Sequence, residues 1–190
     1  MIKKFIRWFV HFSMRGRNVL LFLGLYIMMA ALVMSEGATQ IKKLSGKDLD
    51  PLDLFFSYSP AIVYPLLEEY GENGRAFYAL FEMTADAVYP IIYTLLFCSL
   101  IGYAWKSFIL KKFQLALLIF TPFLVLVFDY AENTCIVVLL KNYPTQIDWL
   151  VNLSSIFTSS KWISLALCVL VLLAGLGKKG LDLLNTRSKT

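Results

Sequence analysis

Four apolar runs, each long enough to cross a lipid bilayer, constrain this chain more than any other feature. About 30 Å of hydrocarbon requires roughly 20 helical residues at about 1.5 Å per residue. With 58% hydrophobic residues and a mean hydropathy of +0.67, the chain is too apolar for a soluble domain of 190 residues. The sequence predicts an all-α fold, a polytopic membrane four-helix bundle in one transmembrane domain over 1–190. We expect the spans at 18–35, 75–105, 113–133 and 150–177.

The basic residues predict how these spans are oriented. Twelve of the eighteen Lys and Arg lie in the first seventeen residues, in the link 106–112 or after Gly177, and twelve of the thirteen acids lie toward the other side. By the positive-inside rule, both termini and the tail 178–190 are cytoplasmic in a bacterial inner membrane. Basic residues placed this way orient spans, so we exclude nucleic acid as a partner and expect the lipid bilayer instead.

The first residues, 2–12, predict an amphipathic helix. Apolar side chains such as Phe5 and Phe9 fall on one face and cations such as Lys4 and Arg7 on the other. Such a helix lies in the membrane interface. A cleaved signal peptide is the alternative for this basic and apolar start, but its removal would leave only three spans, so we expect the first span to be retained.

An external loop over 36–74 is predicted to contain a short helix. Ser59 followed by Pro60 is typical of a helix start, and Gly71 is a plausible stop after Tyr70. The segment is too apolar for a solvated loop, and we expect it to cover the outer ends of the spans as a lid. The scattered Cys98, Cys135 and Cys168 form no CxxC pair and are expected to be buried thiols.

The helix expected over 75–105 carries a polar stripe. Its polar residues recur every three or four positions and therefore share one face. Carboxylates entering hydrocarbon cost several kcal/mol unless they are paired, protonated or turned toward a polar cavity, so this face must contact protein. The stripe consists of Arg75, Tyr78, Glu82, Asp86, Tyr89 and Tyr93.

Charges on three spans are predicted to lie at one depth. Counted from the cytoplasmic edge of each span, Asp86, Asp129 and Lys161 all lie about 24–29 Å up, at the outer boundary of the membrane. Glu132 and Asn133 follow one turn above Asp129, and Ser154 and Thr158 share a stripe with Lys161. The candidate ligand-binding residues are therefore Arg75, Tyr78, Glu82, Asp86, Tyr93, Asp129, Glu132, Asn133, Thr158 and Lys161.

Three functions remain open for this cluster. The leading hypothesis is binding of a small or lipid-derived ligand or a cation at a charged pocket near the outer face. The first alternative is an enzyme that uses carboxylate acid–base chemistry on a lipid-like substrate. The second is a structural or assembly subunit, in which Asp129–Lys161 and Glu132–Arg75 pairs fix the helix register.

Some chemistry is excluded by the residues present. His11 is the only histidine, so no His-based zinc site or Ser-His-Asp triad is available, and no nucleotide-binding glycine loop occurs. A bound metal would have an all-oxygen ligand set, suited to Mg²⁺, Ca²⁺ or Mn²⁺, although the neighbouring Lys and Arg weaken that reading. The sequence identifies no catalytic residue, metal, cofactor or protein partner.

Five segments resemble a family of small, largely uncharacterised bacterial four-helix membrane proteins. They are PLDLFFSY, YGENGRAFY, DAVYPIIY, FDYAEN with a following YP, and FTSSKW, and together they extend over about two-thirds of the chain. The resemblance implies motif positions that coincide with the polar residues identified from spacing. It implies no activity. These motif positions are Gly74, Arg75, Tyr78, Asp86, Pro90, Tyr93, Asp129, Glu132, Asn133, Thr158 and Lys161.

Overall fold

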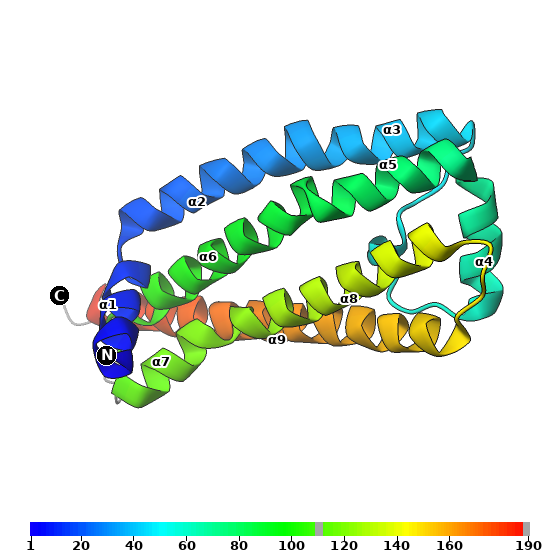
Figure 1. Cartoon of the computed structure of the whole chain (residues 1–190). Helices are drawn as coiled ribbons and strands as arrows, with labels where there is room; N and C mark the ends of the chain where they lie inside the picture. Colours follow the sequence, from blue (N-terminus) through cyan, green and yellow to red (C-terminus); the bar gives the residue numbers. More distant parts are fainter. Residues whose placement is uncertain (109–111, 188–190) are drawn as a thin grey trace.

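The computed structural model describes residues 1–108 and 112–187, which form a bundle of long helices (Figure 1). Four helical rods in this part of the chain are long and apolar enough to cross a membrane. Only 11% to 44% of their apolar stretches is buried within the protein, and a surface this apolar requires lipid around it. The chain is a multi-pass membrane protein, and the predicted all-α four-helix bundle is confirmed. The rods are Gly16–Ser45, Gly71–Trp105, Phe113–Asn142 and Asp148–Asp182.

The first rod is longer than the sequence suggests. It consists of α2 (Gly16–Met28), a π-helical stretch (Met29–Met34) and α3 (Ser35–Ser45), and it ends at Gly46 with φ +68°, a conformation that favours glycine. We expected an external loop from residue 36, whereas the helix continues to residue 45. The reason is packing of α3 on α5, where Gly37 leaves room for the Phe81 ring.

The second rod is interrupted inside the predicted polar stripe. It consists of α5 (Gly71–Met83) and α6 (Ala85–Trp105) rather than one regular helix from residue 75. Thr84 separates the two with φ −121° and ψ −81°, and its hydroxyl donates to Leu80 O at 2.7 Å. Pro90 follows one turn into α6 and removes the amide that would bond the Asp86 carbonyl. Irregular backbone therefore surrounds Asp86.

The other two rods extend beyond their predicted outer ends. The third comprises α7 (Lys112–Phe120) and α8 (Pro122–Asn142), which are separated at Thr121, and it continues past the expected end at residue 133. The fourth is α9 (Asp148–Arg187). The predicted turn after Trp105 includes residues 109–111, and the predicted tail includes residues 188–190; both sets lie outside the described residues.

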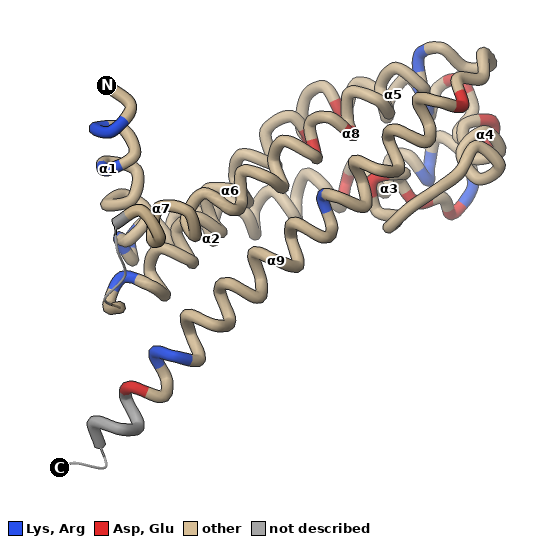
Figure 2. Tube along the Cα trace, turned by 90° about the horizontal axis from the view of Figure 1, so that it is seen from below, with Lys and Arg blue, Asp and Glu red and all other residues tan. Residues whose placement is uncertain are grey.

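Two short helices lie across opposite ends of the bundle (Figure 1). The predicted amphipathic segment forms α1 (Ile2–Ser13) at the left end of the bundle in Figure 1, and Gly102 of α6 allows the backbone of Ser13 to approach closely. The predicted lid helix forms α4 (Pro60–Glu69) at the far end. Figure 2 shows that Lys and Arg dominate the terminal end, whereas nearly all acidic residues lie toward the α4 end.

The buried core has two apolar parts with a polar layer between them. Along α8, Val125 belongs to the core near the termini and Ile136 to the core near α4, and Asp129 and Glu132 lie between them. The same order recurs along α9, where Lys161 lies between Val151 and Leu165. The charged residues of the third and fourth rods therefore meet at one level of the bundle.

Candidate functional site

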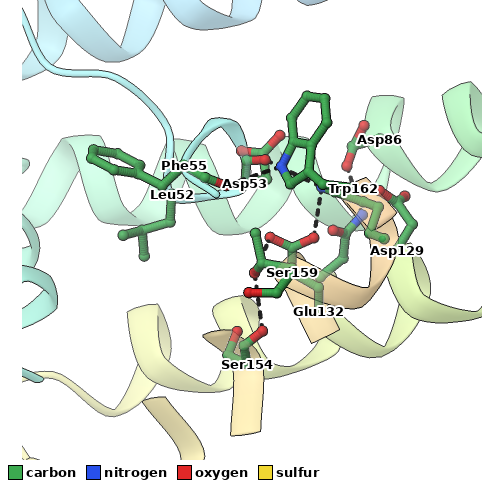
Figure 3. A network of polar contacts seen from close by, with 12 residues as sticks. Leu52, Asp53, Phe55, Asp86, Asp129, Glu132, Ser154, Ser159 and Trp162 are labelled. Atoms are coloured by element: carbon green, nitrogen blue, oxygen red, sulfur yellow. Dashed lines mark hydrogen bonds and ion pairs between the residues drawn. The ribbon is translucent and has the colours of Figure 1, made fainter. Parts of the chain in front are cut away.

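The segment between α3 and α4, residues 46–59, folds back into the bundle and supplies part of the site. It is termed here the re-entering segment. It contains a short 3₁₀ turn, Leu52–Leu54, and its backbone is held by side chains of α5 and α9 (Figure 3). Tyr78 Oη accepts from Leu52 N at 2.9 Å, and Trp162 Nε1 donates to Phe55 O at 3.0 Å. Ser155 and Ser159 bind the backbone of Tyr58 and Phe56 at 2.9 Å. Non-helical backbone at membrane depth requires such partners.

Lys161 is the cation of the site. Among the described residues, no other Lys or Arg forms an ion pair with Asp129 or Glu132. Its Nζ lies 2.6 Å from Glu132 Oε2, 3.3 Å from Asp129 Oδ1 and 3.2 Å from the backbone oxygen of Asp53. The contacts with Glu132 and Asp129 are ion pairs, and the contact with Asp53 O is a hydrogen bond. One cation thus links α8, α9 and the re-entering segment, and among the described residues it forms no ion pair with a further carboxylate.

Hydroxyl groups complete the surroundings of Glu132, which is fully buried. Thr158 Oγ1 donates to Glu132 Oε1 at 2.7 Å. Tyr58 Oη lies 3.0 Å from Thr158 Oγ1 and 2.6 Å from Ser154 Oγ. Burial, followed by the nearby Glu132 charge, raises the pKa of Tyr58 above its usual range. Both oxygens of Glu132 are therefore paired with donors from α9.

Three further carboxylates converge beside this pair. Side-chain oxygens of Asp53, Glu82 and Asp86, termed here the acidic triad, lie within 4.8 Å of one another. Tyr78 Oη donates to Asp53 Oδ1 at 3.0 Å, and Asn133 Nδ2 donates to Asp86 Oδ2 at 2.6 Å. Glu82 Oε2 is buried without a hydrogen-bond partner. Among the described residues, no Lys or Arg forms an ion pair with the triad.

A groove leads to the acidic triad from the outside of the bundle. It has a volume of about 420 Å³ and lies between the second rod and α8, with Glu82 and Asn133 among its lining residues. Other lining residues, Met83 and Val138, are among the exposed apolar residues of the bundle surface. The groove therefore lies on the side of the bundle, with apolar residues of the second rod and α8 in its walls.

Arg75 lies outside this network, and Tyr93 lies at its edge beside Asp129. Arg75 Nη1 donates to Leu67 O at 2.7 Å, and its guanidinium lies 4.3 Å from the Tyr143 ring centroid. The Glu132–Arg75 pair that we considered is therefore wrong. Tyr93 lies two turns along α6 from Asp86, and its buried hydroxyl faces Asp129 rather than the acidic triad.

The other eight predicted residues are brought together through direct contacts or membership of the triad. Sequence reasoning missed Asp53, Tyr58 and Trp162. A signal for Asp53 and Tyr58 was present, because they lie in PLDLFFSY, whose aromatic and leucine side chains cannot remain in a solvated loop. The eight residues are Tyr78, Glu82, Asp86, Asp129, Glu132, Asn133, Thr158 and Lys161.

Comparisons with protein-family models, with curated proteins and with solved structures give no match to this chain. The charges, contacts and access of this site are therefore the features that indicate its function.

Proposed function

We propose that this membrane protein binds a positively charged ligand, either a cation or the cationic group of a small or lipid-derived molecule, at the acidic triad. The observation that supports this is an imbalance of charge in a buried place. The site has five carboxyl groups and one ammonium, and that ammonium contacts Asp129, Glu132 and a backbone oxygen rather than a side chain of the triad. Three converging carboxylates without a cation repel one another, and a bound positive charge removes that repulsion.

The position of the triad supports the same proposal. Glu82 belongs both to the triad and to the wall of the membrane-facing groove. A ligand that partitions into the bilayer therefore has a direct route to a carboxylate, whereas a soluble ligand would approach from the α4 end. Access from the side allows a lipid-derived or membrane-soluble cation to enter, as well as a metal ion.

We also propose the orientation and the setting of the protein. Basic residues dominate the end that carries both termini, so the positive-inside rule places that end in the cytoplasm and the α4 end outside. The motif pattern supports assignment to the family of small bacterial four-helix membrane proteins named above. On that basis the membrane is a bacterial inner membrane, and the acidic triad lies near its outer face.

Glu82→Gln tests binding in detergent-purified protein, with Glu72→Gln as the matched control at an exposed position of the same helix. We expect ligands from a panel of divalent cations, alkylamines and ammonium-headgroup lipids to raise the melting temperature of the wild type and the control. The same ligand should not shift Glu82→Gln. Without ligand, Glu82→Gln should melt higher than the wild type, because it removes repulsion within the triad.

A purely structural role predicts the reverse pattern. If the carboxylates only hold the helices in register, Glu82→Gln melts lower than Glu72→Gln and no member of the panel shifts the wild type. That pair of results would overturn the proposed function.

Acid–base catalysis on a lipid-like substrate is a second candidate. It is supported by one observation, the buried Glu82 Oε2 that has no hydrogen-bond partner and lies beside the groove. A carboxyl group in that position can take a proton from, or give one to, a molecule that enters from the membrane. Incubation of the wild type and Glu82→Gln with labelled bacterial lipids distinguishes the two, because only catalysis produces a Glu82-dependent product.

A further inference from the structure

We infer that Asp53, Glu82 and Asp86 bind one divalent metal ion, with the side-chain oxygen of Asn133 as a fourth ligand. This inference rests on the proposed function, since it identifies the positive charge that the site accepts. The four residues come from three parts of the fold: the segment between α3 and α4, the two sides of the Thr84 break, and α8.

The charges within the cluster divide into two unequal groups. Lys161 lies within 3.3 Å of both Asp129 and Glu132, so this group carries one residual negative charge. The acidic triad has three carboxyl groups with neutral donors from Tyr78 and Asn133 only, and it carries three negative charges when all three are ionised. A single ammonium would leave two of those charges uncompensated, whereas a divalent ion compensates all but one. The charge of the triad therefore favours a metal over an organic amine.

The spacing of the oxygens agrees with a single metal ion. Oxygens on opposite sides of a calcium ion, each at about 2.4 Å, stand about 4.8 Å apart. The triad oxygens lie within 4.8 Å of one another in the protein as it folds. An all-oxygen set that includes three carboxylates suits Ca²⁺, Mg²⁺ or Mn²⁺ and offers none of the nitrogen or sulfur ligands that softer metals prefer.

Asn133 supplies an independent indication of a ligand. Its side chain is 6% exposed, and Nδ2 donates to Asp86 Oδ2 at 2.6 Å, which holds the amide beside the triad. Its Oδ1 is buried and accepts no hydrogen bond. A buried amide oxygen without a donor is unfavourable, and a metal ion bound next to Asp86 would satisfy it. The buried Glu82 Oε2 has the same need.

The surroundings hold the ligands in the way metal sites require. Tyr78 Oη bridges Leu52 N and Asp53 Oδ1, so it fixes the Asp53 carboxylate relative to its own backbone. Asn133 Nδ2 binds one oxygen of Asp86 and leaves the other for the metal. Such partners orient metal ligands, and their loss typically weakens metal binding by about 10–100-fold.

The test is titration of metal-free, detergent-purified protein with Mn²⁺, followed by electron paramagnetic resonance, and with Ca²⁺, followed by calorimetry. We expect one ion per chain in the wild type and in the exposed control Glu72→Gln. Glu82→Gln and Asp53→Asn preserve side-chain size and should each weaken binding by at least about 100-fold, and Tyr78→Phe by about 10–100-fold. A melting curve for each variant shows that it remains folded.

Three results would overturn the inference. Mn²⁺ bound equally by the wild type, Glu82→Gln and Asp53→Asn would place the ion elsewhere. No binding of Mn²⁺ or Ca²⁺, together with an alkylamine shift that Glu82→Gln abolishes, would reject the metal and leave the proposed function standing. If neither metals nor amines act on the wild type, both proposals fail.

Discussion

Lys161 Nζ lies 2.6 Å from Glu132 Oε2, which joins α9 to α8 in the layer between the two apolar cores. Both side chains are nearly or fully buried, and the remaining Glu132 oxygen accepts from Thr158. A buried ion pair adds little net stability over an apolar pair, but removing one partner leaves an uncompensated charge. The contact therefore fixes which faces of α8 and α9 meet.

Lys161→Met should lower the free energy of unfolding by about 3–5 kcal/mol, because Asp129 and Glu132 lose their only described cation. The measurement is denaturant-induced unfolding in detergent micelles. Lys43→Met, at an exposed position of α3, is the control and should change stability little. In the double variant Lys161→Met/Glu132→Gln, part of the loss should return. If Lys161→Met is as stable as the control Lys43→Met, the Lys161–Glu132 ion pair is solvated and unimportant for stability.

The spacing of apolar and polar residues predicted the spans, the lid helix and the common depth of Asp86, Asp129 and Lys161. These features depend on the spacing of residues and on the length of each apolar run relative to the bilayer thickness, and both can be counted in the sequence. The ends of the helices were predicted less well. Helices α3 and α8 continue beyond the apolar runs because each packs on α5, and packing between rods stabilises helix where hydropathy no longer requires it.

The division of charge within the site could not be predicted. Arg75 was expected in the cluster from its helical phase, but it binds Leu67 O at the end of the lid helix. Asp53 was missed because its position depends on a non-helical segment, and no periodicity indicates where such a segment lies. The net charge of the triad results from these two differences, since one expected cation is absent from it and one further acid is present.

Trp162 anchors the re-entering segment, so its indole N–H has a specific effect. Trp162→Phe keeps an aromatic ring but loses the donor to Phe55 O. We expect faster hydrogen–deuterium exchange over residues 50–59 and a loss of about 0.5–1.5 kcal/mol, because the partly buried carbonyl loses its hydrogen bond. Trp149→Phe is the control, since its side chain is 68% exposed. Unchanged exchange in Trp162→Phe would mean that the other contacts of the segment are enough to hold it.

Cysteine labelling tests the orientation of the bundle. The native Cys98, Cys135 and Cys168 are buried and should remain unlabelled in the folded protein. Lys47→Cys, beyond the outer end of α3, should react with a membrane-impermeant maleimide on intact cells, whereas Lys4→Cys should react only after the membrane is permeabilised. The reverse pattern would contradict the cytoplasmic placement of the termini.

Tyr58 and Tyr70 make stability depend on alkaline pH. Burial raises the pKa of both phenols, and each hydroxyl is hydrogen-bonded, Tyr70 Oη donating to Asp50 O at 2.7 Å. Because the folded pKa exceeds the unfolded value of about 10, the contribution of the two phenols to the free energy of unfolding is complete below pH 10 and is lost as the pH rises toward the folded pKa.

We expect both phenols to ionise only together with unfolding, as monitored by tyrosinate absorbance beside circular dichroism. Tyr70→Phe should flatten the alkaline loss of stability. Ionisation of both tyrosines near pH 10 in the folded protein would show that water reaches them, and the re-entering segment would then be open rather than packed.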